Sequence, residues 1–292
     1  MLTNLIRDPS NSLDLRYGTS QNASTSSRFL VFANGRSEWI EKYSSIPDDL
    51  SLAADTGFMT FDHRGQGASG GARAWIDSYD TYATDMKKII DTAIAGKPYN
   101  LMCHSMGGLI SLYGIMKGLI APRCLVLSSP LLGMPNKPLP ANIAYHTASL
   151  LTDLFMGHVH TGGGRYWRPP FEENVLTHSV ERYEIIQNSP YPVPSPTFEW
   201  VRASYRATQF AHAPENIAKL RIPILILCGT EEKVVDPAVI PQWVGKAKAA
   251  GVDVDFHWIQ GGYHELLVES KPILTPVLEI IRRWFDKRGF PL

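Results

Sequence analysis

The chain has 292 residues, enough for one large domain or two small ones. Its 28 basic and 28 acidic residues balance, and the sequence contains no cluster of basic residues, so we expect no nucleic-acid partner. The hydrophobic fraction of 44% is ordinary for a globular protein, and no apolar run reaches the length of a membrane span.

Short β-type runs alternate with longer helical patterns along most of the chain. Strands that are apolar on both faces and are joined by helices form a parallel sheet covered on both sides, so the predicted class is α/β. An antiparallel edge strand is expected over 13–21. The other strands are predicted over 28–35, 58–65, 99–105, 124–130, 222–229 and 254–262, and the helices over 37–57, 78–96, 106–119, 237–251 and 273–289.

Residues 131–220 interrupt this alternation. Apolar side chains between 145 and 155 fall near helical spacing, and prolines alternate through 189–200. We predict a core domain of residues 1–130 and 221–292 and a mostly helical cap (lid) insertion of 131–220. The apolar segment 148–157 is a candidate for an acyl-chain channel, for the core of the cap, or for transient contact with a membrane surface. Trp167 is a candidate for the pocket wall or for packing against the neighbouring glycines.

The stretch LMCHSMGG, residues 101–108, places a serine between a strand and a helix. A tight turn there exposes the hydroxyl and brings the N–H groups of the helix N-terminus close to it. Gly107 and Gly108 let the backbones approach, whereas Cys103 stands where the usual pattern has its first glycine. Ser105 is therefore a candidate nucleophile, with helix capping as the alternative role.

Enzymes with this turn place an acid and a histidine later in the chain. Glu231, Glu232 and Asp236 follow the strand predicted at 222–229, and His264 lies in a glycine-flanked loop after the strand at 254–262. Loops at the carboxyl ends of parallel strands meet at one edge of the sheet. We predict that His264 is the general base and that one of these carboxylates orients it.

An oxyanion hole needs two N–H donors. Met106, directly after the serine, is the first candidate. The loop after the first core strand, at 33–38, supplies the second. We expect the N–H of Arg36 there, with Gly35 as the alternative.

With these residues in place, the chain resembles α/β-hydrolases of the monoacylglycerol lipase and bacterial lysophospholipase group. The similarity lies in FMTFDHRGQGASGG (58–71), CHSMGG (103–108), LSSPLLG (127–133) and GYHELLVE (262–269), and two cap stretches resemble the lysophospholipase branch. It implies an α/β-hydrolase fold, a mostly parallel central sheet with helices on both faces and a helical cap insertion. It also implies a serine hydrolase that cleaves a lysophospholipid or monoacylglycerol without metal or cofactor.

The chain departs from this family at Asn34, Cys103 and Glu232. The family usually has histidine, a smaller residue and aspartate at these positions. We favour Glu232 as the acid over Asp236, which precedes Pro237 and is also suited to capping the next helix.

Several alternatives stay open from the sequence. The chain could be a short-chain carboxylesterase, a thioesterase, a peptidase, an acyltransferase or a non-catalytic binding protein on the same fold. We expect Asp62, His63 and Arg64 to organise a turn, and we expect no metal at His158 and His160. The lack of an apolar signal segment and three cysteines beside apolar runs (103, 124 and 228) favour a cytoplasmic protein with buried thiols.

Overall fold

The computed structural model describes residues 1–8, 13–135, 138–164, 166, 168–290 and 292. Within these residues the strands form one sheet of eight, in the order β1-β2-β4-β3-β5-β6-β7-β8. β1 (Leu2–Asp8) and β2 (Leu13–Thr19) are antiparallel. The remaining strands are parallel to one another: β3 (Arg28–Ala33), β4 (Thr56–Phe61), β5 (Tyr99–His104), β6 (Leu125–Ser128), β7 (Ile224–Gly229) and β8 (Val254–Ile259). The predicted mostly parallel sheet is confirmed, and the segment expected as an antiparallel edge strand forms β2, antiparallel to β4. Its place at the edge is wrong, because β1, which the sequence analysis did not predict, pairs with its outer side.

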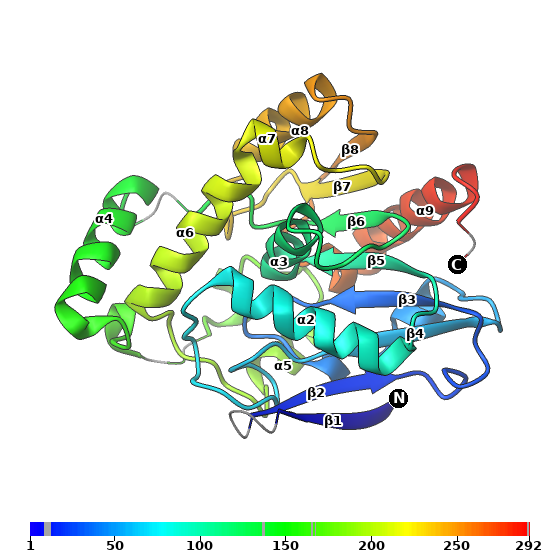
Figure 1. The fold of residues 1–292 in the computed structure, drawn as a ribbon, viewed down its shortest axis with the longest axis horizontal. Coiled ribbons are helices and arrows are strands. Elements are labelled where there is room, and N and C mark those ends of the chain that lie inside the picture. Colours follow the sequence, from blue (N-terminus) through cyan, green and yellow to red (C-terminus); the bar gives the residue numbers. More distant parts are fainter. Residues whose placement is uncertain (9–12, 136–137, 165, 167, 291) are drawn as a thin grey trace.

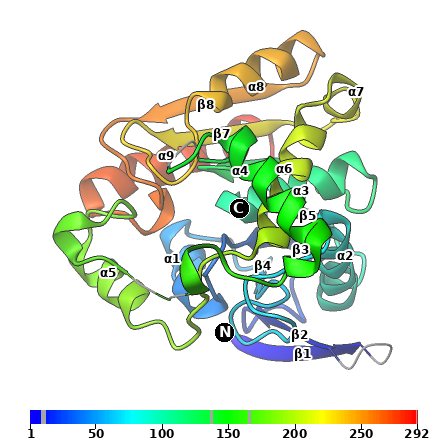
Figure 2. The ribbon, with the colours of Figure 1, turned by 90° about the vertical axis from the view of Figure 1, so that its left-hand side faces the viewer.

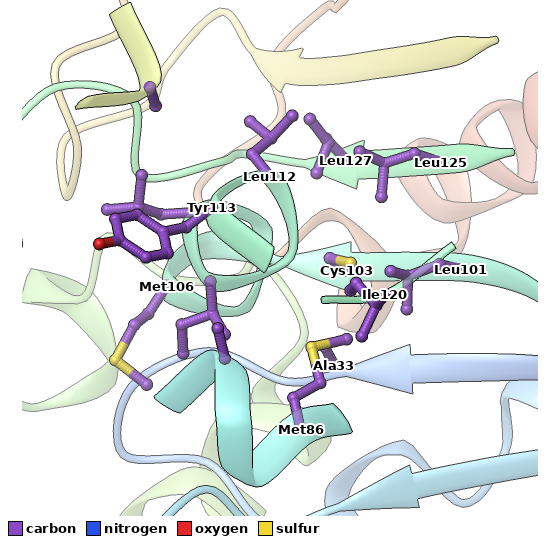
Figure 3. Packing of buried hydrophobic residues seen from close by; sticks show 14 of the residues in the cluster. Ala33, Met86, Leu101, Cys103, Met106, Leu112, Tyr113, Ile120, Leu125 and Leu127 are labelled. Atoms are coloured by element: carbon purple, nitrogen blue, oxygen red, sulfur yellow. The ribbon is translucent and has the colours of Figure 1, made fainter. Parts of the chain in front are cut away.

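Helices cover both faces of the sheet (Figure 1). Side chains from α2 (Tyr79–Ile94), α3 (Ser105–Met116) and α8 (Val239–Ala249) share one buried apolar cluster with the sheet. Those from α1 (Ile46–Asp49) and α9 (Lys271–Lys287) share a second cluster on the other face. Figure 3 shows the first cluster, where strand side chains such as Cys103 and Leu127 lie under α3.

The prediction of one helix over 37–57 is wrong. The segment forms a 3-10 turn, η1 (Ile40–Tyr43), the single turn of α1, and then a loop that leads into β4. Pro47 in the first turn of α1 has no N–H to extend a preceding helix, and Ser51 adopts a positive φ of 55°. These local restraints outweigh the helical pattern of apolar residues.

Between β6 and β7 the chain forms a set of helical segments. They are α4 (Ala141–Leu151), the π-helical turn η2 (Thr152–Met156), the 3-10 turns η3 (Thr161–Gly164) and η4 (Phe171–Glu173), α5 (Val180–Gln187), α6 (Phe198–His212) and α7 (Pro214–Ile217). α4 and α6 lie together beyond the carboxyl ends of the parallel strands (Figures 1 and 2). Tyr145 of α4 stacks on Tyr205 of α6, with ring centroids 4.4 Å apart. Trp167 lies outside the described residues, within which no helix is long and apolar enough to cross a membrane.

The start of α3 passes very close to the end of β3. A Cβ atom built on Gly107 would lie 2.4 Å from the carbonyl oxygens of both Ala33 and Asn34. Real Cβ atoms do not approach backbone this closely, so only glycine permits the present spacing. The contact brings the first turn of α3 against the loop that follows β3.

We predict that Gly107→Ala lowers the free energy of unfolding by about 1–3 kcal/mol, because the added methyl group must push two backbones apart. Urea denaturation of the purified variant measures this. Gly245→Ala is the matched control, since a Cβ there meets nothing within 4 Å in α8. That control should be neutral or gain roughly 0.5–1 kcal/mol. Equal stability of wild type and Gly107→Ala would contradict the packing argument.

Candidate active site

Ser105 lies at the tight turn between β5 and α3. It is 8% exposed and its φ of 50° is positive, which is uncommon for a residue with a Cβ. The turn is held by Leu131, whose N–H donates to the Ser105 carbonyl at 3.0 Å. Beneath the turn, the side chain of Cys103 is buried in place of the usual glycine, and its Sγ lies 3.0 Å from the hydroxyl of Ser111 on α3. The backbone strain is typical of a functional site.

His264 and Glu232 reach Ser105 from loops that follow β8 and β7. His264 Nε2 lies 3.1 Å from Ser105 Oγ, and His264 Nδ1 lies 2.7 Å from Glu232 Oε2. An ionised carboxylate only accepts hydrogen bonds, so Nδ1 carries the proton toward Glu232 and Nε2 is left to accept the serine hydroxyl. The N–H groups of Val234 and Val235 donate to the other Glu232 oxygen at 2.6 and 3.2 Å.

Of the three candidate carboxylates, the structure brings only Glu232 against His264 in the described chain. Asp236 Oδ1 instead accepts from the N–H of Ala238 at 3.1 Å, in the turn that leads into α8. Glu231 is exposed. The longer glutamate side chain reaches the imidazole from the loop. The alternative role of Asp236 as the N-cap of a helix beginning at Pro237 is not found, because α8 begins at Val239 after Ala238, and Asp236 instead bonds within the turn before it.

The pKa values of Glu232 and His264 are shifted in the directions that favour an ionised carboxylate beside a protonated imidazole. Burial raises the pKa of Glu232, but the nearby His264 and two N–H donors outweigh it and lower the pKa overall. Burial lowers the pKa of His264, and the Glu232 carboxylate reverses this, so that the net shift is upward. Glu232 therefore stabilises an imidazolium at position 264.

The loop after β3 carries the expected oxyanion donors. The N–H of Gly35 donates to Glu38 Oε2, so this alternative donor is already engaged. In the described part of the chain, no hydrogen bond uses the N–H of Arg36 or of Met106. A Cβ on Gly35 would lie 3.1 Å from the Cβ of Ser105, so this loop is directly beside the serine.

A buried charge cluster that the sequence analysis missed lies under this loop. Glu38 Oε1 accepts from Lys42 Nζ and from the Tyr43 hydroxyl, both at 2.7 Å. Lys42 Nζ also lies 2.7 Å from Glu265, the residue after His264. Burial raises the pKa of Glu38, but Lys42 and His104 lower it to about 2. The i, i+4 spacing of Glu38 and Lys42 could have predicted their ion pair from the sequence, but not the contact with Glu265.

Glu38, His104 and Glu265 hold three potential metal ligands within 4.8 Å of one another. The Lys42 ammonium already contacts both carboxylates, so a cation occupies the space between them. Burial lowers the pKa of His104 to about 3, which keeps its ring neutral. We assign the cluster to charge compensation and not to metal binding.

The other motifs from the sequence have structural partners. Asp62 accepts from the N–H groups of Ile40 and Ala68 at 2.9 and 2.8 Å, which fixes the turn as expected. His158 stacks on Trp75 with ring centroids 4.7 Å apart, and His160 Nδ1 lies 2.7 Å from a carbonyl oxygen. The two histidines therefore serve separate packing contacts.

Ser105 and Met106 open onto a cavity of about 450 Å³, within the range of small-molecule sites. Its wall is largely apolar, and Leu131, Ala148, Phe198 and Trp200, all from the segment between β6 and β7, contribute to it. A buried hydroxyl, imidazole and carboxylate thus line up at the end of an apolar cavity.

This geometry agrees with comparisons to known proteins. A family model described as "Serine aminopeptidase, S33" matches residues 24–271. The chain belongs to this family. The fold and the match make it an α/β-hydrolase of the monoacylglycerol lipase and lysophospholipase group.

Named relatives of this hydrolase are similar over most of their length. "Lysophospholipase L2" of Escherichia coli strain K12 is 29% identical over 285 residues, covering 90% of this chain and 82% of that protein. "Phospholipase YtpA" of Bacillus subtilis is 26% identical, covering 88% and 95%. Monoglyceride lipase from Saccharomyces cerevisiae has a similar fold, with a TM-score of 0.79, 19% identity and coverage of 98% and 96%.

We predict that Glu232→Gln lowers the pKa of His264 relative to the wild type, because burial of the ring remains and the carboxylate that contributes most to raising it is lost. In the wild type the imidazolium persists to a higher pH than in the variant. NMR titration of the His264 ring resonances measures both values. Asp236→Asn, the matched control four residues away, should leave the titration unchanged. If Asp236→Asn shifted the pKa of His264 and Glu232→Gln did not, Asp236 and not Glu232 would be the acid.

Proposed function

We propose that this hydrolase cleaves a carboxylic ester of a lipid-like substrate, a lysophospholipid or a monoacylglycerol, through an acyl-enzyme on Ser105. The observation that carries the proposal is the continuous contact of Ser105, His264 and Glu232 at the end of an apolar cavity. Relatives named as a lysophospholipase and a phospholipase support the substrate class.

In this mechanism His264 removes the proton of Ser105 as the hydroxyl attacks the ester carbonyl. The N–H groups of Arg36 and Met106 donate to the oxyanion that forms. Glu232 stabilises the imidazolium, which then protonates the leaving alcohol, and a water molecule repeats the steps to release the fatty acid. The rate should fall in acid as His264 becomes protonated.

The cavity supports an acyl chain better than the amino terminus of a peptide. An aminopeptidase needs a carboxylate to bind the substrate ammonium group, and among the described residues no carboxylate lines the cavity. Its apolar wall is suited to hydrocarbon. The family description therefore covers a wider range of substrates than we propose for this chain.

We further propose that residues 131–220 act as a cap over a core of 1–130 and 221–292, and that the cap forms the acyl site. Ala148 of α4 and Phe198 and Trp200 of α6 line the cavity, which supports this division.

We also propose a cytoplasmic location. All three cysteines are buried free thiols, which supports it.

Fatty-acid release from lysophosphatidylcholine, monoacylglycerols and nitrophenyl esters of graded chain length tests the proposal. Long-chain lipids should be cleaved by the wild type, and Ser105→Ala should lose activity by roughly a millionfold. Ala148→Phe should narrow the cavity and reduce kcat/KM for long chains at least roughly tenfold, while esters of short acids are spared.

His146→Phe is the matched control, because it adds the same ring at an exposed position of α4. It should leave the chain-length profile unchanged. If only short esters are cleaved, the protein is a carboxylesterase and the proposed lipid substrate is wrong. Full activity in Ser105→Ala would remove the mechanism.

We also propose that the cap makes transient contact with a lipid surface. Leu150, Leu154 and Phe155, around the end of α4 and in η2, are 62, 58 and 97% exposed. Apolar side chains of this size gain free energy by leaving water, and a membrane-bound substrate would supply the apolar phase.

We predict that the double variant Leu154→Ser and Phe155→Ser binds phosphatidylcholine vesicles at least roughly tenfold more weakly in co-sedimentation. Leu5→Ser is the matched control, since Leu5 is 62% exposed on β1, away from the cap. An equal loss in the control, or no vesicle binding by the wild type, would contradict membrane contact through the cap.

A further inference from the structure

The turn formed by residues 61–66, at the end of β4, is bound at two places to the chain segment that follows β3. At the start of that segment, Asn34 Nδ2 donates to a carbonyl of the turn at 2.9 Å, and the Asn34 carbonyl oxygen lies 2.9 Å from His63 Nε2. At its far end, the N–H of Ile40 donates to Asp62. All three contacts are buried, so the turn fixes both ends of the loop beside Ser105.

Gln66, the last residue of this turn, contacts the middle of the same loop and is only 1% exposed. Its Oε1 accepts from the N–H of Ser37 at 2.5 Å, and its Nε2 lies 3.6 Å from Met106 Sδ. Because a backbone N–H only donates, the amide oxygen must face Ser37, which leaves the amide NH₂ toward the sulfur. One buried side chain therefore touches both segments that carry the proposed oxyanion donors.

Three successive N–H groups of the loop differ in their partners. The N–H of Gly35 donates to Glu38, and the N–H of Ser37 donates to Gln66. Between them, the N–H of Arg36 makes no hydrogen bond within the part of the chain that the structure describes. Buried side chains thus hold both neighbours of this N–H group and leave the group itself available to a bound oxygen.

The backbone at Ser37 needs such support. Its φ of 64° is positive, which is uncommon for a residue with a Cβ and persists only where the surroundings hold it. The turn that provides the support is itself anchored, because Arg64 makes two hydrogen bonds of 2.7 Å to Asp85 of α2. The strained part of the loop is therefore attached to a fixed part of the core.

We propose that Gln66 is a positioning residue for the oxyanion hole, which keeps the loop of Arg36 at a fixed place relative to Met106. The inference rests on the proposed mechanism, in which the N–H groups of these two residues bind the oxyanion. Such donors stabilise a transition state only if they are oriented before the charge develops. Without the Gln66 contact the Arg36 N–H would shift, and a displacement of about 1 Å costs roughly a hundredfold in rate.

Gln66→Met tests the proposal, because methionine keeps the length of the side chain and removes the acceptor for Ser37. The affinities of decyl trifluoromethyl ketone and decyl methyl ketone are measured on the full chain. The carbonyl carbon of the trifluoromethyl ketone forms a bond to Ser105 Oγ, the serine proton passes to His264, and the carbonyl oxygen becomes an oxyanion. The methyl ketone fills the same cavity without a stable adduct.

We expect Gln66→Met to bind the trifluoromethyl ketone roughly 10- to 100-fold more weakly and the methyl ketone equally well. The kcat for nitrophenyl butyrate should fall by a similar factor while KM is unchanged, since the lost interaction acts only in the transition state. Gln66→Asn, whose amide is one methylene too short to reach Ser37, should give the same pattern and provides the test if the methionine variant does not fold.

The matched control is Gln242→Met, which makes the same chemical change at an exposed position of α8. It should leave both affinities, kcat and KM unchanged. An equal loss of affinity for the two ketones, or a rise in KM with kcat unchanged, would overturn the positioning role and assign Gln66 to the shape of the cavity. Full affinity of the Gln66 variants for the trifluoromethyl ketone would also overturn it.

The wild type separates this proposal from the proposed function. If the wild type cleaved no ester and formed no adduct, the acyl-enzyme on Ser105 would be wrong and the positioning role would fall with it. Cleavage of nitrophenyl butyrate without cleavage of long-chain lipids would overturn the lipid substrate alone, because the effect of Gln66 on kcat is read from the short ester.

Discussion

The close contact between the first turn of α3 and the end of β3 is the constraint on which the site depends. α3 begins directly after β5, and Gly107 in its first turn lies against the carbonyls of Ala33 and Asn34 at the end of β3. The short turn holds Ser105 at a positive φ and beside the loop that carries Arg36. The sheet holds the end of β3 and the start of α3 in place. The stability of the sheet thereby offsets the backbone strain at Ser105.

Buried charges connect the loops around that turn. Glu38 holds the N–H of Gly35, Lys42 links Glu38 to Glu265, and Glu265 directly follows His264 in the chain. The loop beside the serine and the loop of the histidine are therefore joined through one ammonium group. Such groups are costly to bury, and each of them is paired. We interpret the cluster as a rigid support that keeps the two loops at a constant separation.

The cavity combines an apolar wall with one end rich in polar groups. Ser105 and Arg36 are among the residues that line it, and side chains from α4 and α6 form part of the apolar wall. Exclusion of water strengthens electrostatic interactions there, including the pair of His264 and Glu232. The same segment that encloses the cavity also exposes Phe155 on its outer surface. One insertion thus shapes both the inside of the proposed acyl site and the outside that would meet a lipid surface.

The sequence by itself determined most of the alternation of strands and helices and the candidate pair Ser105 and His264, because apolar periodicity, glycines and strand ends are local signals. It missed β1, which pairs with the outer side of β2 and forms the edge of the sheet. It favoured Glu232 over Asp236 through the family resemblance, but no local pattern separates two carboxylates that follow the same strand four residues apart. That choice depends on which carboxylate reaches an imidazole more than 25 residues away, and only the folded loops put Glu232 there. The helix expected over 37–57 was broken by Pro47 and by the buried contacts of Glu38 and Lys42, whose partner Glu265 is more than 200 residues distant. Pairings between distant residues are a property of the tertiary structure, since no local pattern encodes them.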